Sequence, residues 1–241
     1  MMLKKLLQAA ADIIFPRHCL NCAILLERPG AIDLCPACLA RLLFIGAPFC
    51  PVCGLMYPKS AGDSHPCTVC GHGKYAFDRA RAVFAYNKVV AKMIHSLKFS
   101  GKRTGLRTMA ALAEHSLLTQ LSCPDIIIPV PLHPKKLRGR GFNQSQLLAS
   151  VLFADQGHKI QSYLIRTRPT RPQLGLRGVE RRQNVAGAFA VPEPDMVRGR
   201  SVCLVDDVFT TGTTVNECAK SLKKSGAARV EVATLARVID L

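Results

Sequence analysis

The stretch from Val202 to Thr214 reads VCLVDDVFTTGTT. Its four leading apolar residues predict a strand that is buried on both faces, as in a parallel sheet. Two adjacent carboxylates, Asp206 and Asp207, come where that strand emerges, and a hydroxyl-rich loop then starts a helix. Free backbone N–H groups at such a helix start attract a phosphate, and carboxylates beside them suit sugar hydroxyls or a metal ion. The stretch therefore predicts a sugar-phosphate site, and an acidic turn with an ordinary N-cap is the weaker interpretation.

Strands and helices alternate along the chain around this stretch. We expect strands at 80–86, 125–130, 162–166, 201–205 and 229–236, and helices at 89–99, 106–121, 142–153 and 214–225. This order predicts an α/β fold, with a parallel sheet flanked by helices and right-handed crossovers. In such sheets ligands gather at the carboxyl ends of the strands, where residues 131–141, 169–184 and 206–214 all fall. We therefore expect these three segments to form one composite site.

Four Cys-x-x-Cys pairs precede the α/β region. They are Cys19/Cys22, Cys35/Cys38, Cys50/Cys53 and Cys67/Cys70. Two such pairs complete a tetrahedral zinc site, and four thiolates leave no open position for a reactive water, so we predict structural Zn²⁺. A redox-active dithiol and an iron–sulfur cluster are the alternatives. The simplest pairing is sequential, with the first four thiols on one ion and the last four on the next, and a cross-braced pairing stays open.

The composition of the chain shifts at residue 75. We expect residues 1–75 to form an N-terminal helix followed by a zinc-ribbon module, and residues 76–241 to form the α/β domain. The lone Cys123, Cys203 and Cys218 are interpreted as small buried hydrophobic residues. No apolar run approaches the length of a membrane span, and no export signal is found. We therefore expect a cytoplasmic protein, in which paired cysteines bind metal rather than form disulfides.

Positive charge is concentrated in two blocks of this chain, whose formal net charge is +17. Residues 88–140 hold ten Lys and Arg against two acidic residues, and residues 166–182 hold six against one. Such blocks indicate a polyanionic partner: the phosphates of a small ligand, a nucleic acid or an acidic lipid surface. A solvated basic face that aids solubility is the alternative.

Position by position, residues 202–214 resemble the signature of type I phosphoribosyltransferases, which bind phosphoribosyl pyrophosphate (PRPP). The resemblance implies that the paired acids contact the ribose hydroxyls and that the following loop holds the 5′-phosphate. It also implies Mg²⁺ bridging ribose and pyrophosphate, held largely by ligand oxygens. The PRPP-binding residues implied are Asp206, Asp207, Thr210, Thr211, Gly212, Thr213 and Thr214.

Further stretches narrow the resemblance. Residues 129–144 (PVPLHPKKLRGRGFNQ) and 173–189 (QLGLRGVERRQNVAGAF) are similar to those of the ComF family, as are residues 94–103 and the cysteine run. The ComF family is a phosphoribosyltransferase-like group associated with DNA uptake during natural competence. The resemblance spans essentially the whole chain and implies a type I phosphoribosyltransferase-like sheet behind a double zinc ribbon.

The resemblance also implies roles for the two basic loops. Residues 131–141 would be the pyrophosphate loop, because Arg makes bidentate phosphate contacts and the glycines free the backbone. The residues assigned to it are Pro131, Leu132, Lys135, Lys136, Arg138 and Arg140. Residues 169–184 would be a mobile cover that closes over the ligand. The cations assigned to the cover are Arg177, Arg181 and Arg182.

The sequence identifies no acceptor site and leaves open whether the protein is an enzyme. The favoured interpretation is a PRPP-binding competence-type protein that handles incoming single-stranded DNA in natural transformation. Its basic blocks would contact the DNA backbone. The alternative is an active phosphoribosyltransferase that acts on an unidentified nitrogenous acceptor. The expected partners are PRPP, single-stranded DNA, and a competence helicase or other DNA-uptake proteins. A pure zinc-ribbon interaction module would leave the phosphate loop unexplained.

Overall fold

The computed structural model describes residues 17–26, 30–100, 103–114, 116–171 and 178–239. The main sheet of these residues has four parallel strands in the order β1-β6-β5-β2. The strands are β1 (Arg79–Ala85), β2 (Ile126–Pro129), β5 (Ser201–Phe209) and β6 (Arg229–Arg237). Nearly all of their residues are buried, as expected for continuous apolar runs between two helical layers. The register places Val202 beside both Ile126 and Val230.

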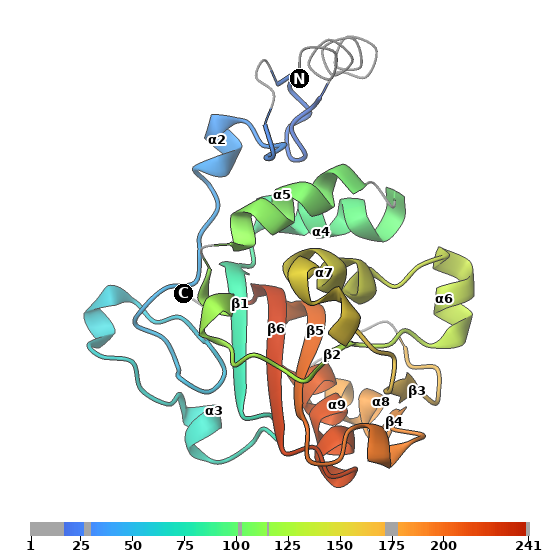
Figure 1. The fold of residues 1–241 in the computed structure, drawn as a ribbon. Coiled ribbons are helices and arrows are strands. Elements are labelled where there is room, and N and C mark those ends of the chain that lie inside the picture. The colour runs from blue at the N-terminus through green and yellow to red at the C-terminus, as the bar shows by residue number, and fades with distance from the viewer. Residues whose placement is uncertain (1–16, 27–29, 101–102, 115, 172–177, 240–241) are drawn as a thin grey trace.

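Helices cover both faces of this sheet (Figure 1). On one face lie α4 (Lys88–Ser100), α5 (Arg103–Ala113) and α7 (Gln144–Leu152), and on the other α8 (Gly178–Val185) and α9 (Thr213–Lys224). Each face has its own apolar core. The first includes Met93, Met109 and Leu148, and the second includes Val215 and Leu222. The layers and strand order confirm the predicted α/β fold.

The remaining described elements are short. They are the helices α2 (Pro36–Leu39), α3 (Thr68–Gly71) and α6 (Pro134–Arg140), the 3-10 turns η1 (Lys59–Ala61), η2 (Leu117–Gln120), η3 (Ala154–Lys159) and η4 (Pro194–Met196), and the strands β3 (Ile165–Arg166) and β4 (Phe189–Ala190). The strand expected at 162–166 is therefore reduced to β3, which pairs antiparallel with β4 outside the main sheet.

Two segments that were predicted as loops contain helices. Pro134 opens α6, the His133 ring accepts the Lys135 N–H at its N-cap, and Gly141 ends it in the left-handed region. The second helix, α8, begins only at Gly178, after the prolines of the predicted loop. Short polar helices carry little hydrophobic periodicity, so the sequence pattern does not reveal them.

Other boundaries also differ from the predictions. The helix expected at 106–121 ends at Ala113, and Ser116 Oγ accepts the Leu118 N–H to begin the separate turn η2. The strand expected at 201–205 continues to Phe209, because β5 stays paired with β6 over that length. Cys123 is exposed rather than buried, and the Lys159 ammonium lies 3.2 Å from its Sγ.

The two cysteine-rich segments join the two different apolar cores. The first contributes Cys19 and Cys38 to the core of α4 and α5, and the second contributes Cys50 and Cys53 to the core of α9. The chain between them lies along the edge strand β1, where Ile45 N–H donates to Val83 O at 3.0 Å. In Figure 1 the first segment lies above α5 and the second lies beside β1.

Candidate phosphate-ligand site and zinc clusters

The eight paired cysteines form two separate four-thiol clusters. Within each cluster the Sγ atoms lie within 4.8 Å of one another. The clusters are Cys19, Cys22, Cys35 and Cys38, and Cys50, Cys53, Cys67 and Cys70. This grouping confirms the sequential pairing and excludes the cross-braced one. Four converging thiols in each cluster fit a closed, tetrahedral structural zinc site.

Backbone donors prepare each cluster to hold a cation. Cys35 N–H and Cys67 N–H point at the Sγ atoms of Cys19 and Cys50, at 3.4 and 3.3 Å. Burial alone would raise the pKa of the Cys50 thiol, but the N–H groups of Cys53 and Cys67 lower it to about 7. Burial, followed by repulsion from Cys50 and Cys67, raises the pKa of Cys53 to about 11 although Arg237 opposes the rise. Four neighbouring thiolates therefore need a bound cation, a role that a zinc ion would fill.

A cavity of about 260 Å³ opens between β5, α6, α7 and the start of α9, and we call it the phosphate-loop cavity. Its wall combines a carboxylate pair, a threonine loop and several cations. The lining residues are Val130, Pro131, Leu132, Lys136, Arg140, Gln144, Ser145, Arg166, Arg171, Asp206, Asp207, Val208, Phe209, Thr210, Gly212, Thr213, Thr214 and Val215. The segments 131–141 and 206–214 thus meet at the carboxyl ends of β2 and β5, as predicted for a composite site.

Gly212 shapes the loop that leads into α9. Its φ is +70°, and an added Cβ would lie 2.4 Å from Phe209 Cζ. Only glycine fits both the backbone conformation and this close approach. The hydroxyls of Thr211 and Thr213 lie 2.7 Å apart beside it. Gly212, Thr213 and Thr214 at this helix start line the cavity, and the free N–H groups of a helix start favour an anion.

The two carboxylates have different settings. Asp206 Oδ1 accepts from Ser145 Oγ at 3.0 Å and from Asp207 N–H at 2.9 Å. Asp207 is buried, and its Oδ1 accepts the Val208 N–H at 2.9 Å. The Ser145 contact fixes Asp206 against α7, so strand pairing and this tertiary hydrogen bond help to hold the pair at the cavity wall. Carboxylate oxygens are ligands that Mg²⁺ prefers, so Asp206 and Asp207 fit the predicted magnesium ion.

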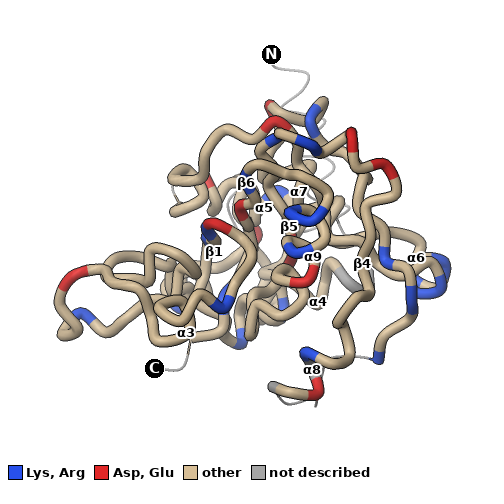
Figure 2. The backbone as a smooth tube through the Cα atoms, turned by 90° about the horizontal axis from the view of Figure 1, so that it is seen from below, with Lys and Arg blue, Asp and Glu red and all other residues tan. Residues whose placement is uncertain are grey.

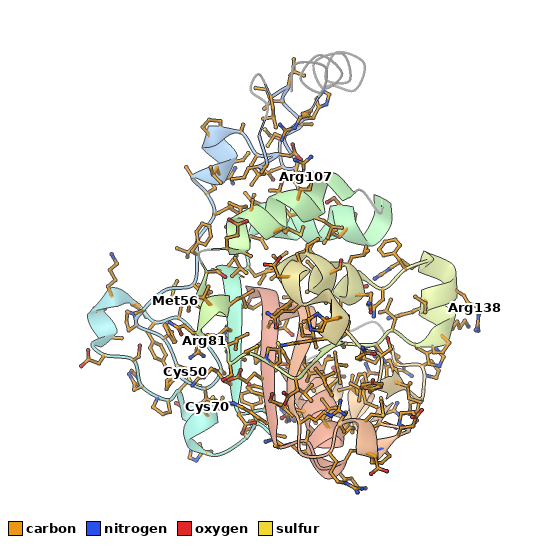
Figure 3. The ribbon with its side chains drawn as sticks, in the orientation of Figure 1. Cys50, Met56, Cys70, Arg81, Arg107 and Arg138 are labelled. Atoms are coloured by element: carbon orange, nitrogen blue, oxygen red, sulfur yellow. The ribbon has the colours of Figure 1, made fainter. Side chains whose placement is uncertain are left out.

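The helix α6 divides its four cations between two sides. Lys136 and Arg140, four residues apart on one face, line the phosphate-loop cavity, and Arg140 donates to Gln144 Oε1. Lys135 and Arg138 are not among the described residues that line it. Figure 2 shows the concentration of basic residues on α6, and Figure 3 shows Arg138 pointing away from the body of the protein.

Comparison with known proteins finds matches to both parts of this chain. A double zinc ribbon domain model matches residues 10–74, and a phosphoribosyl transferase domain model matches residues 166–240. The DNA utilization protein YhgH of Escherichia coli K12 is 36% identical over 217 residues, which cover 87% of this chain and 92% of that protein. Competence protein F of Haemophilus influenzae is 32% identical over 212 residues, covering 85% and 90%. The chain belongs to the ComF family.

More distant matches to the ComF-family chain were also found. Competence protein ComFC of Streptococcus pneumoniae is 25% identical over 219 residues, covering 91% of this chain and 87% of that protein. The allosteric regulatory enzyme of purine biosynthesis covers 58% of this chain and 30% of its own, at 18% identity and a TM-score of 0.36. A purine phosphoribosyltransferase from Pyrococcus horikoshii covers 54% and 81%, at 20% identity and a TM-score of 0.32.

The ComF-family site contains residues that the sequence reasoning missed. Arg166, at the end of β3, lines the phosphate-loop cavity and lies over the Phe189 ring, 5.4 Å from its centroid. Burial lowers the pKa of its guanidinium, and its buried Nε has no hydrogen-bond partner among the described residues. Ser145 and Gln144 reach the site from α7. Arg166 belongs to the second basic block, and that block was the one signal available from the sequence.

Of the three arginines assigned to the mobile cover, only Arg182 has a side chain that the structure describes, and it does not line the phosphate-loop cavity. Arg182 sits on α8 and lines a second, neighbouring cavity. Arg177 and the side chain of Arg181 lie outside the described residues. Thr211 faces the second cavity as well, while Thr210 and Thr213 line both cavities.

Proposed function

We propose that this ComF-family protein binds PRPP and contributes to handling incoming single-stranded DNA in natural transformation. One observation carries the PRPP part: the carboxylate pair, the threonine loop at the start of α9 and the basic face of α6 line a single cavity. Sugar hydroxyls need acceptors, a 5′-phosphate needs N–H donors, and a pyrophosphate needs cations. The cavity offers all three groups within about 260 Å³.

Each part of PRPP has a matching part of the wall in this proposal. Asp206 and Asp207 accept from the ribose hydroxyls, and the loop Thr210–Thr214 binds the 5′-phosphate. Lys136, Arg140 and Arg166 neutralise the pyrophosphate, next to the backbone of Pro131 and Leu132. Mg²⁺ would be held mainly by PRPP oxygens and water, with the carboxylates close by. Lys135 and Arg138 do not line the cavity and are assigned no contact with PRPP.

The DNA part of the proposal is supported by the relatives and by charge. Relatives that cover most of this chain are named as DNA utilization and competence proteins. The formal net charge of +17 suits a polyanion, and Lys135 and Arg138 present exposed cations beyond the PRPP site. Of the helices that the structure describes, none is long and apolar enough to cross a membrane.

Calorimetric titration with PRPP and Mg²⁺ tests the site assignment. The double variant Asp206→Asn/Asp207→Asn removes both negative charges with little change of shape. We expect it to weaken PRPP binding by about a hundredfold, since two hydrogen bonds to charged acceptors are weakened. Binding of a single-stranded oligonucleotide should stay salt-dependent and unchanged in the same variant. PRPP affinity equal to that of the wild type would overturn the site assignment.

The same material distinguishes binding from catalysis. If the protein is a transferase, PRPP with a suitable nitrogenous acceptor will release pyrophosphate over many turnovers, and the double variant will abolish that release. If it is a binding protein, PRPP will be recovered intact after incubation with a panel of nucleobases. Oligonucleotide binding that is absent at low salt would overturn the DNA part.

A further inference from the structure

A second cavity of about 820 Å³ adjoins the phosphate-loop cavity, and we call it the ribbon-side cavity. It lies between the second zinc cluster, the helix α8 and the first turn of α9. Leu55, Val69 and Tyr75 come from the ribbon side, Arg182 from α8, and Asn216 from α9. Its volume falls in the range of small-molecule sites, about 300–1,000 Å³.

The two cavities share part of one wall. Thr210 and Thr213 line both of them. Tyr75, on the arm that leads from the ribbon into β1, donates its hydroxyl to Thr211 O at 3.1 Å. The ribbon-side cavity therefore borders the loop to which the 5′-phosphate of PRPP is assigned, and the second zinc ribbon forms its outer wall.

The charge of the ribbon-side cavity favours an anion. Lys74, Arg182, Lys220 and Arg237 line it, against the single carboxylate of Glu217. Lys220 is paired with Glu217 at 2.6 Å. Arg237 is buried next to the second thiol cluster, and its Nη2 donates to Cys53 Sγ at 3.3 Å. Lys74 and Arg182 are both exposed and come from two different elements, so they are the cations best placed for a ligand.

The apolar part of the wall indicates what kind of anion fits. Tyr75 is stacked on Phe77 with ring centroids 4.6 Å apart, so its ring is held in place. Leu55, Val69 and Val238 extend this apolar surface. A fixed aromatic ring with apolar neighbours and nearby cations suits a planar base attached to a phosphate. Inorganic phosphate alone would leave the apolar wall unused.

We propose that the ribbon-side cavity binds a nucleotide unit, with Lys74 and Arg182 at its phosphate and the apolar wall against its base. This inference deepens the proposed function. It rests on the proposed function only if the bound nucleotide is part of an incoming DNA strand. A free nucleoside monophosphate offers the same chemistry, so both sources are tested. The shared threonines place the nucleotide next to PRPP, separated by the loop Thr210–Thr213.

The test uses the full chain with zinc bound and two probes, thymidine 5′-monophosphate and a labelled ten-residue oligo(dT). The variant Lys74→Glu/Arg182→Glu reverses both cations of the ribbon-side cavity. The control Arg200→Glu/Lys224→Glu changes charge by the same amount at two exposed positions, near the start of β5 and the end of α9. Zinc content and the unfolding midpoint verify that both variants are folded.

We expect the Lys74/Arg182 variant to bind oligo(dT) about tenfold or more weakly, with a shallower salt dependence, and the control variant to lose much less. PRPP affinity should stay at the wild-type value in both. Competition by thymidine monophosphate would assign the cavity to free nucleotides as well, and binding of oligo(dT) alone would assign it to a strand. Equal losses in the two variants, or none in either, would overturn the proposal. Failure of PRPP binding with intact nucleotide binding would instead overturn the PRPP part of the proposed function and leave the inference about the ribbon-side cavity standing.

Discussion

Gly212 joins the ligand loop to α9. Its positive φ and its close approach to Phe209 are two separate reasons why a larger residue would be unfavourable there. Gly212 and Gly199 share a φ of +70°, but an added Cβ meets Phe209 Cζ at 2.4 Å at position 212 and nothing within 4 Å at position 199. The pair therefore separates backbone strain, common to both positions, from displacement of Phe209, which is specific to the loop.

We expect Gly199→Ala to lower the free energy of unfolding by about 1–2 kcal/mol and to leave PRPP affinity unchanged. Gly212→Ala carries the same strain and also moves the loop, so it should weaken PRPP binding by about tenfold or more. Urea unfolding and calorimetric titration measure the two quantities. Equal PRPP affinities in the two variants would contradict the role given to the Gly212–Phe209 contact.

Residues of this site differ in how visible they are in the sequence. Asp206 and Asp207 directly follow a buried apolar run, and Gly212 lies in the loop that comes next, so the local pattern predicts them. Ser145 precedes Asp206 by 61 positions and meets it only because α7 packs against β5. Arg166 likewise arrives through a two-residue strand. Contacts made by packing leave no local signal, which is why the sequence did not reveal these side chains.

The helix α6 shows the same limit for a whole element. The basic segment was predicted correctly at the end of β2, because a buried strand followed by Pro, Gly and cations indicates a ligand loop. Its helical form was missed, and helix geometry decides which cations face the ligand. The strands β1, β2 and β6 and the helices α4, α7 and α9 were predicted closely, since each carries a buried run or an apolar face.

A prediction follows for α6. Lys136→Ala and Arg140→Ala should each weaken PRPP binding by about tenfold, because each removes a charged group from the phosphate-loop cavity. Lys135→Ala and Arg138→Ala remove the same charge from the same helix but do not face that cavity. We expect them to change PRPP affinity less than about twofold. Calorimetric titration at constant ionic strength measures all four variants, and equal losses would mean that only net charge matters.

The two zinc ribbons are not equivalent in the whole molecule. The first is fastened to α4 and α5, where the Lys92 ammonium donates to Asn21 O at 2.7 Å and Asp33 N–H donates to Thr108 Oγ1 at 2.8 Å. The second is fastened to the ligand loop: Arg237 bridges Cys53 Sγ and the Phe209 ring, 4.1 Å from its centroid, and Tyr75 bonds to Thr211 O. The second zinc cluster is therefore connected to the phosphate loop through Arg237 and Tyr75.

This difference predicts unequal effects of losing each zinc ion. Cys35→Ser and Cys67→Ser alter equivalent positions of the two clusters, and each should lower zinc content, since three thiolates hold the ion less well than four. We expect only Cys67→Ser to weaken PRPP binding, because it loosens the contacts of Arg237 with Cys53 and Phe209.

The variant Tyr75→Phe is a milder test of the same link, since Cys67→Ser can also impair folding. It keeps the zinc site and removes only the hydroxyl that donates to Thr211 O. We expect it to weaken PRPP binding by a few-fold, as loss of one neutral hydrogen bond does. Equal PRPP affinity in the Cys35, Cys67 and Tyr75 variants would show that the second ribbon has no such role.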